Sequence, residues 1–134
     1  MNLKTVIIDD EQDAIDNLKK IIDEFCKEAK VVGVANIIKD AYKLILEKKP
    51  DLVLLDINMP RGNGFDLMER FPKRTFDVIM VTGYSEFRNK AIEYETYGFI
   101  TKPIDIEKLH NMIKDVLEFR KQNPEKVYWK YPEF

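Results

Sequence analysis

The sequence contains one cysteine, one histidine and no long apolar run, and each shortage excludes a class of protein. The single thiol, Cys26, leaves neither an internal disulfide framework nor a thiolate zinc site. The single imidazole, His110, has no second histidine with which to share a metal. No apolar stretch approaches the ~20 residues that cross a bilayer, and the N-terminus turns acidic too early for a signal peptide. We therefore expect a soluble, cytoplasmic protein.

An excess of charge of either sign is also missing. Lys and Arg number 22 against 24 Asp and Glu, a formal net charge of −2, so the charge balance gives no reason to expect direct nucleic-acid binding. Hydrophobic residues make up 45% and aromatic residues 11% of the 134 positions. This composition and length are typical of one globular domain and not of a disordered chain.

Short apolar runs, most of them rich in β-branched residues, alternate with segments of helical periodicity. The runs predict buried parallel strands near residues 6–8, 31–34, 52–55, 78–81 and 99–100. The periodic segments predict helices near 13–28, 38–48, 64–70 and 86–94, and a last helix that Asp105 caps. On the first helix, Phe25 is expected on the inward stripe with four aliphatic residues. Five β–α units predict a three-layer α/β fold, a doubly wound (βα)5 sandwich around a parallel sheet.

Function in such sheets lies beyond the carboxyl ends of the strands, so the residues at these ends are the candidate site. They comprise three acids, a hydroxyl and an amine: Asp9, Asp10, Asp56, Thr82 and Lys102. Three ionised carboxylates carry −3, and Lys102 offsets only +1 of that charge. A divalent cation would supply the remaining +2, and an all-oxygen donor set favours Mg²⁺.

The same residues are suited to phosphoryl transfer. A carboxylate can act as the nucleophile and become an aspartyl phosphate, while the metal and the lysine neutralise charge on the phosphoryl oxygens. No Ser, His or Cys stands at a predicted strand end, so acyl transfer by a catalytic triad is poorly supported.

Four motifs in this order resemble the response-regulator receiver domains of two-component signalling, which are CheY-like. The motifs are the Asp9-Asp10 pair, Asp56-Ile-Asn-Met-Pro60, Thr82-Gly83 and Lys102-Pro103, and the fit extends from about Leu3 to Leu117. The segments that begin at Thr82 and Ile100 look most like receivers of LytTR-type regulators. The resemblance implies a flavodoxin-like sheet of order 2-1-3-4-5.

The resemblance also implies a role for each matching residue. Asp56 is the expected phosphoacceptor. Asp10 is expected to bind Mg²⁺ directly, Asp9 mainly through water, and Asn58 through its backbone carbonyl. Thr82 and Lys102 are expected to contact phosphoryl oxygens. The implied phosphodonor is a phosphohistidine on a sensor histidine kinase or a small acyl phosphate.

The expected output is a change of surface. When Thr82 moves toward the phosphoryl group, the ring of Phe99 can fill the vacated space, and the face of the fourth helix, fifth strand and fifth helix changes. Phe99 is almost as well explained as a plain core residue. Tyr84 is expected to shield the phosphoryl group and lengthen its lifetime. The expected partners are the kinase and a downstream protein or an output domain outside this sequence, with a homodimer possible.

Two alternatives stay open at this point. The first is a receiver-shaped interaction module that works without phosphorylation, although such a module need not keep the acids, Thr82 and Lys102. The second is a Mg²⁺-dependent hydrolase of the haloacid-dehalogenase type, which wants a second acid where this chain has Asn58. On the receiver reading the chain is not an enzyme, because it catalyses only its own phosphorylation and dephosphorylation. The family's usual Gly-Ala before the switch aromatic is Tyr97-Gly98 here, which bears on the packing of the fourth helix.

The last residues form an aromatic tail. We expect a receiver domain over 1–121 and a tail over 122–134, which carries Tyr128, Trp129, Tyr131 and Phe134. Exposed rings in such number usually have a binding or packing role. The tail either packs back on its own domain, the reading we favour, or binds a partner or a second copy.

Overall fold

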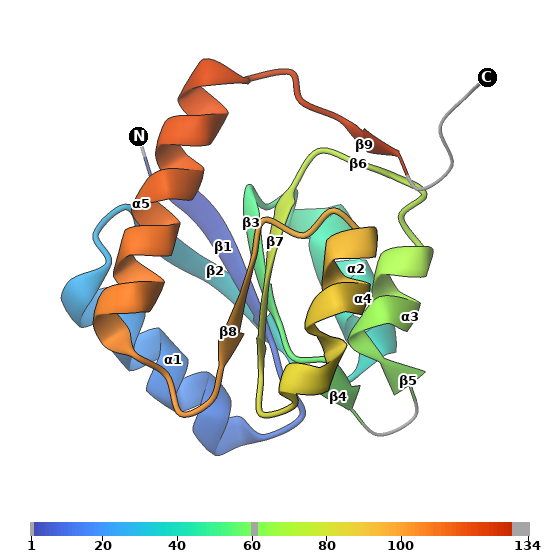
Figure 1. The fold of residues 1–134 in the computed structure, drawn as a ribbon, viewed down its shortest axis with the longest axis horizontal. Helices are drawn as coiled ribbons and strands as arrows, with labels where there is room; N and C mark the ends of the chain where they lie inside the picture. Colours follow the sequence, from blue (N-terminus) through green and yellow to red (C-terminus); the bar gives the residue numbers. More distant parts are fainter. Residues whose placement is uncertain (1, 60–61, 130–134) are drawn as a thin grey trace.

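A parallel five-stranded sheet forms the centre of the computed structural model, which describes residues 2–59 and 62–129 (Figure 1). The strand order is β2-β1-β3-β7-β8, and every neighbouring pair is parallel. The predicted order 2-1-3-4-5 is therefore confirmed. The strands are β1 (Leu3–Ile8), β2 (Ala29–Ala35), β3 (Leu52–Leu55), β7 (Asp77–Thr82) and β8 (Gly98–Thr101).

Helices cover both faces of this sheet, as the three-layer prediction requires. Figure 1 shows α1 (Gln12–Phe25) and α5 (Ile106–Gln122) on one face. The other face carries α2 (Ile38–Lys48), α3 (Gly64–Glu69) and α4 (Arg88–Glu93), the last preceded by the 3-10 turn η1 (Ser85–Phe87). The fourth helix predicted over 86–94 is thus a 3-10 turn followed by a short α-helix.

Alternation along the strands supplies two cores. Val53 and Leu55 point to the α2–α4 layer, whereas Leu52 and Leu54 point to the α1–α5 layer. Since β3 is covered on both faces, all four residues are buried, which explains why the run is continuously apolar. Each fully buried side chain of this size contributes roughly 1.5–3 kcal/mol to the free energy of unfolding.

Edges and helix ends account for the differences from the sequence prediction. Phe25 does not join the inward stripe of α1 but is 47% exposed, because the helix ends at this residue and Cys26 caps it. The edge strand β2 is only partly buried. The predicted cap at Asp105 is confirmed, since its carboxylate accepts a hydrogen bond from the Lys108 amide at 3.1 Å.

Two short antiparallel pairs were not predicted. One joins β4 (Asn58–Met59) to β5 (Gly62–Asn63). The other joins β6 (Lys73–Arg74) to β9 (Tyr128–Trp129), so this part of the aromatic tail packs on the domain (Figure 1). The tail residues Tyr131 and Phe134 lie outside the described residues.

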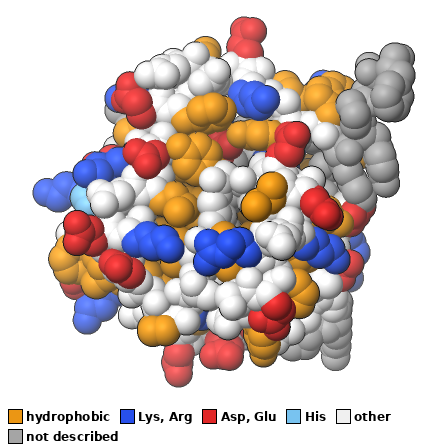
Figure 2. All heavy atoms as spheres, viewed as in Figure 1, with side chains coloured by type: hydrophobic (Ala, Val, Ile, Leu, Met, Phe, Trp, Pro, Cys, Tyr) orange, Lys and Arg blue, Asp and Glu red, His pale blue; other side chains and the backbone are white. Residues whose placement is uncertain are grey.

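The face formed by α4, β8 and α5 points toward the viewer in Figure 2. Hydrophobic side chains lie on it between basic and acidic ones. Ile92 of α4 is the most exposed of the large hydrophobic residues described, at 67%. Within 2–59 and 62–129, the helices are all too short or too polar to traverse a bilayer.

Candidate functional site

Three carboxylates meet where β1 and β3 end. Oxygen atoms of Asp9, Asp10 and Asp56 all lie within 4.8 Å of one another. The register of the sheet causes this, because Ile8 is aligned with Leu55 and the Asp56 amide donates to the Ile8 carbonyl at 2.9 Å. Asp9 and Asp56 are buried and Asp10 is half-buried, so the sheet edge collects negative charge in a partly dry environment.

Lys102 bridges two of these acids. Its ammonium Nζ lies 2.7 Å from Asp9 Oδ2 and 3.3 Å from Asp56 Oδ2. The Lys102 amide donates to the Thr82 carbonyl at 2.8 Å, which holds the backbone of Lys102 beside the end of β7. Burial alone would lower the pKa of Lys102, but the hydrogen bond to Asp9 and the charge of Asp56 hold that pKa above its ordinary value. The side chain therefore stays a cation.

Backbone amides orient the same two acids. Asp9 Oδ1 accepts from the Glu11 amide at 3.0 Å, and Asp56 Oδ1 accepts from the Asn58 amide at 3.2 Å. In both acids the other oxygen, Oδ2, faces Lys102. Each carboxylate is thus held from two sides, which pre-organises it for a reaction or for a cation.

The site has an excess of negative charge that a divalent cation would balance. Burial and the neighbouring Asp9 raise the pKa of Asp10, as expected for like charges that share a site. With one ammonium against three carboxylates, a charge of −2 is left. The donors are all oxygen atoms, and such a set with few protein ligands fits Mg²⁺. The residues present therefore fit the metal predicted from the sequence.

Thr82 and Phe99 lie on neighbouring strands near the acids. Thr82 is fully buried at the end of β7, and its hydroxyl oxygen accepts from the Tyr84 amide at 3.4 Å. Phe99 is buried in the α2–α4 core, aligned with Met80 of β7. The guanidinium of Arg88 in α4 lies 5.0 Å from the centre of its ring. This stack was not predicted, since nothing in the sequence marks an arginine 11 positions away as its partner.

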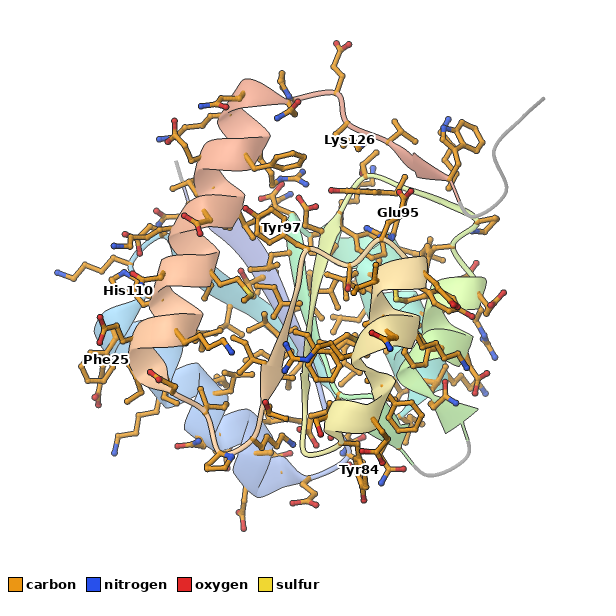
Figure 3. All side chains as sticks on the ribbon, viewed as in Figure 1. Phe25, Tyr84, Glu95, Tyr97, His110 and Lys126 are labelled. Carbon is orange, nitrogen blue, oxygen red and sulfur yellow. The ribbon has the colours of Figure 1, made fainter. Side chains whose placement is uncertain are left out.

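Tyr84 lies two residues after the end of β7, at the η1 end of α4 (Figure 3). Its hydroxyl accepts a hydrogen bond from the Asn58 side-chain amide at 3.1 Å. Asn58 follows β3 and Tyr84 follows β7, so this bond joins the two loops that flank Asp56 and Thr82. Every residue predicted for the site is therefore placed at this edge, except Phe99, which lies within the core beneath it.

Comparison with protein families gives one matching description. A profile described as response regulator receiver domain matches residues 5–114. The sensory transduction protein LytT of Bacillus anthracis is 31% identical over 130 residues, which cover 96% of this chain and 51% of that protein. An uncharacterized response regulatory protein of Vibrio parahaemolyticus is 35% identical over 113 residues, 84% of this chain and 46% of that protein. The chain spans about half the length of the curated relatives it matches.

Solved structures agree with the sequence matches. The REC domain of AraT, a response regulator from Geobacillus stearothermophilus, aligns with a TM-score of 0.81 and 28% identity over 93% of this chain and 100% of that one. The response regulator domain of Thermotoga maritima CheB aligns with a TM-score of 0.79 and 29% identity over 88% and 98%. The resemblance predicted from the four motifs is confirmed by both kinds of comparison.

Proposed function

This chain belongs to the response regulator receiver domain family, and we propose that it is a switch controlled by phosphorylation of Asp56. The observation that carries the proposal is the bridge from Lys102 to Asp9 and Asp56, with Asp10 within 4.8 Å of both acids. A carboxylate can attack a phosphoryl group only where positive charge offsets the negative charge of both. Here Lys102 supplies one positive charge, and the acid cluster can bind a cation that supplies more.

In the proposed reaction a carboxylate oxygen of Asp56 attacks the phosphorus of a phosphohistidine on a sensor kinase. A P–O bond to Asp56 forms while the P–N bond breaks, and the imidazole nitrogen leaves with the bonding electrons and takes a proton. Negative charge accumulates on the phosphoryl oxygens. Lys102 neutralises part of this charge and the Thr82 hydroxyl donates to one oxygen. A small acyl phosphate reacts in the same way with a carboxylate as the leaving group.

The metal belongs to the same proposal. Asp10, Asp56 and the Asn58 carbonyl would hold Mg²⁺, with Asp9 acting mainly through water. When bound, the ion supplies positive charge next to the transferring phosphoryl group. Asp9 and the Glu11 amide keep the cluster in place, since their hydrogen bond ties the start of α1 to the end of β1.

The proposed output is the α4–β8–α5 face. Phosphorylation turns the single charge of Asp56 into about −2 with new acceptor oxygens, and Thr82 is the buried donor at the strand end beside it. Movement of Thr82 changes the space available to Phe99, and with it the packing of Arg88 and α4. A downstream protein or an output domain reads this face, where Ile92 is exposed. We propose that the chain works in the cytoplasm, where a sensor kinase would present its phosphohistidine.

Removing magnesium tests this proposal. The chain incubated with an acyl phosphate and Mg²⁺ is expected to gain one phosphoryl group, measured as intact mass over time. With a chelator in place of Mg²⁺, uptake is expected to slow by about a hundredfold or more, the order lost with one electrostatic stabiliser of a transition state. Equal uptake with and without the metal would contradict the metal's proposed role. No uptake from either donor class would favour the phosphorylation-independent module.

Shortening Tyr84 is expected to shorten the lifetime of the phosphoryl group. The Tyr84 hydroxyl accepts a hydrogen bond from Asn58, two residues after Asp56, and in this proposal the ring restricts the path of the attacking water. Tyr84→Ala opens that path and is expected to raise the hydrolysis rate roughly fivefold, equivalent to about 1 kcal/mol of barrier. The measurement is decay of the phosphorylated mass after the donor is removed. Tyr84→Phe keeps the ring but loses the hydroxyl that accepts from Asn58, so its rate is expected to lie between those of the parent and Tyr84→Ala; an unchanged rate in Tyr84→Ala would refute the shielding role.

The hydrolase alternative has no support at the position it depends on. Asn58 stands where a second acid would be needed, and its side-chain amide donates to Tyr84. Turnover of an added phosphomonoester by the chain would be the result that restores this alternative.

A further inference from the structure

The residues that follow α5 return to the domain at the end of the sheet opposite Asp56. Strand β9 pairs with β6, with Lys73 opposite Trp129 and Arg74 opposite Tyr128. In Figure 1 this pair lies at the end of α4 that is far from η1 and the acidic site. Figure 3 shows the same separation through Tyr84 at one end of α4 and Glu95 at the other. We call Arg74, Asp77, Arg120 and Tyr128 the C-terminal clasp.

Tyr128 contacts both a carboxylate and a guanidinium of this clasp. Its hydroxyl donates to the carboxylate of Asp77, which is 1% exposed and also accepts from Arg120 Nη1 at 3.0 Å. The guanidinium carbon of Arg74 lies 4.1 Å from the centre of the Tyr128 ring, a cation–π stack. Burial and the hydrogen bond to Asp77 raise the pKa of Tyr128, so the phenol stays a neutral donor. The contact is therefore specific and not a loose apolar one.

Arg74 connects this clasp directly to α4. It is 6% exposed, and its Nη2 donates to the carbonyls of Tyr94 at 3.0 Å and Glu95 at 2.9 Å. Its Nη1 donates to the Phe76 carbonyl. Tyr94 and Glu95 directly follow α4, and Glu95 has a left-handed backbone with φ of 55°. Arg74 thus satisfies carbonyls at the C-terminal end of α4, where a positive charge is favourable.

We propose that Arg74 couples α4 to β9, so that the segment 126–129 is a second output of the switch at the far end of the sheet. The same guanidinium contacts the Tyr128 ring and the carbonyls after α4, so neither can shift without changing the other's contact. A groove of about 740 Å³ lies between the two, lined by residues that include Phe71, Glu93 and Trp129, and leaves room for such a shift. Coupling of this kind is reciprocal, so the state of the tail also biases α4.

The mechanical link does not depend on phosphorylation, and hydrogen exchange of the full chain tests it. The amides of Tyr94, Glu95 and Thr96 donate to carbonyls of α4, so their exchange reports the end of this helix. Tyr128→Ala is expected to speed their exchange by roughly tenfold, since it removes the ring stacked on Arg74, whose Nη2 donates to the carbonyls of Tyr94 and Glu95. Tyr128→Phe keeps the ring and is expected to show a smaller effect in the same direction. Lys126→Ala removes a cation 5.2 Å from the same ring centre and serves as the control.

A result in which β9 exchanges faster while residues 94–96 keep their protection would overturn the proposal. The tail would then be a passive strap. If Tyr128→Ala does not fold, the exchange of β9 and of residues 94–96 in Tyr128→Phe decides whether the tail is coupled to α4 or not.

The signalling half of the inference rests on the proposed function, and Trp129 can report it. This residue is the only tryptophan of the sequence, is 43% exposed and has Lys73 Nζ 4.9 Å from its ring centre. Phosphorylation with an acyl phosphate and Mg²⁺ is expected to change the quenching of its fluorescence by acrylamide. The change is expected to be lost in Arg74→Met, which should still take up the phosphoryl group.

Intact mass of the same samples separates the two possible failures. A sample that gains a phosphoryl group without any change at Trp129 contradicts the second output and leaves the proposed function in place. A sample that gains none contradicts the proposed function, and hydrogen exchange still decides whether Arg74 couples α4 to β9.

Discussion

Asp56→Asn is expected to take up no phosphoryl group under conditions in which the parent chain takes up one. The amide that replaces the carboxylate has nearly the same volume and keeps an acceptor oxygen for the Asn58 amide, but it is not a nucleophile at neutral pH. Lys102 loses its partner at 3.3 Å and keeps Asp9 at 2.7 Å. The variant should therefore fold normally, and intact mass after incubation with an acyl phosphate and Mg²⁺ measures the loss.

The control for this result is Asp13→Asn. Asp13 is an exposed acid in the first turn of α1, so its removal changes the net charge by the same amount without touching the site. Uptake in this variant should equal that of the parent. Uptake by Asp56→Asn would mean that the acceptor had been wrongly assigned, and Asp9 and Asp10 would then be the acids to replace next.

Asp77→Ala is expected to lower the free energy of unfolding by about 3 kcal/mol, the lower end of the range for one broken partner of a buried ion pair. Asp77 is the acid of the C-terminal clasp, and its loss leaves the Tyr128 hydroxyl and Arg120 without this acceptor. Arg120 keeps the Thr75 carbonyl at 2.8 Å and Asp51 at 3.4 Å, which limits the loss. Urea denaturation of parent and variant measures the difference.

Asp77→Asn separates charge from hydrogen bonding in the same place. The amide keeps an oxygen for Tyr128 or Arg120, so we expect a cost of about 1 kcal/mol, that of a weakened hydrogen bond. Equal costs for both variants would mean that the negative charge, and not the acceptor geometry, holds the clasp. A cost below 0.5 kcal/mol for Asp77→Ala, roughly that of an ordinary surface substitution, would contradict the structural role assigned to this acid.

The fold was predictable because its central strands carry a simple signal. Residues 52–55 and 78–81 are covered on both faces, so their apolar runs are unbroken. The polar residues that end or follow the parallel strands, such as Asp9, Asp56 and Thr82, must meet at one edge of the sheet. Asp9 and Asp56 were placed correctly for this reason. The assignment of each acid to a step of phosphoryl transfer came from the family resemblance and stays a prediction.

The features that were not predicted depend on contacts between residues far apart in the sequence, which leave no pattern in either segment. Strands β6 and β9 have two residues each and are brought together by the fold, so neither has a recognisable periodicity. Arg74 looks like one more charged residue in the sequence, and only the structure shows it buried between a ring and two carbonyls. Phe25 was misplaced for a related reason, because the position at which a helix ends determines the direction of its last side chain.

The ion pair of Lys102 with Asp9 joins residues that are 93 positions apart in the chain. During synthesis, two of the three acids leave the ribosome with the first strand, whereas the lysine follows only after β8. A nascent or truncated copy that ends before β8 therefore has acids without their ammonium and lacks a strand of the sheet that aligns them. On the proposed function, such a copy would be unable to accept a phosphoryl group, so the capacity to respond would be acquired only once synthesis has passed Lys102.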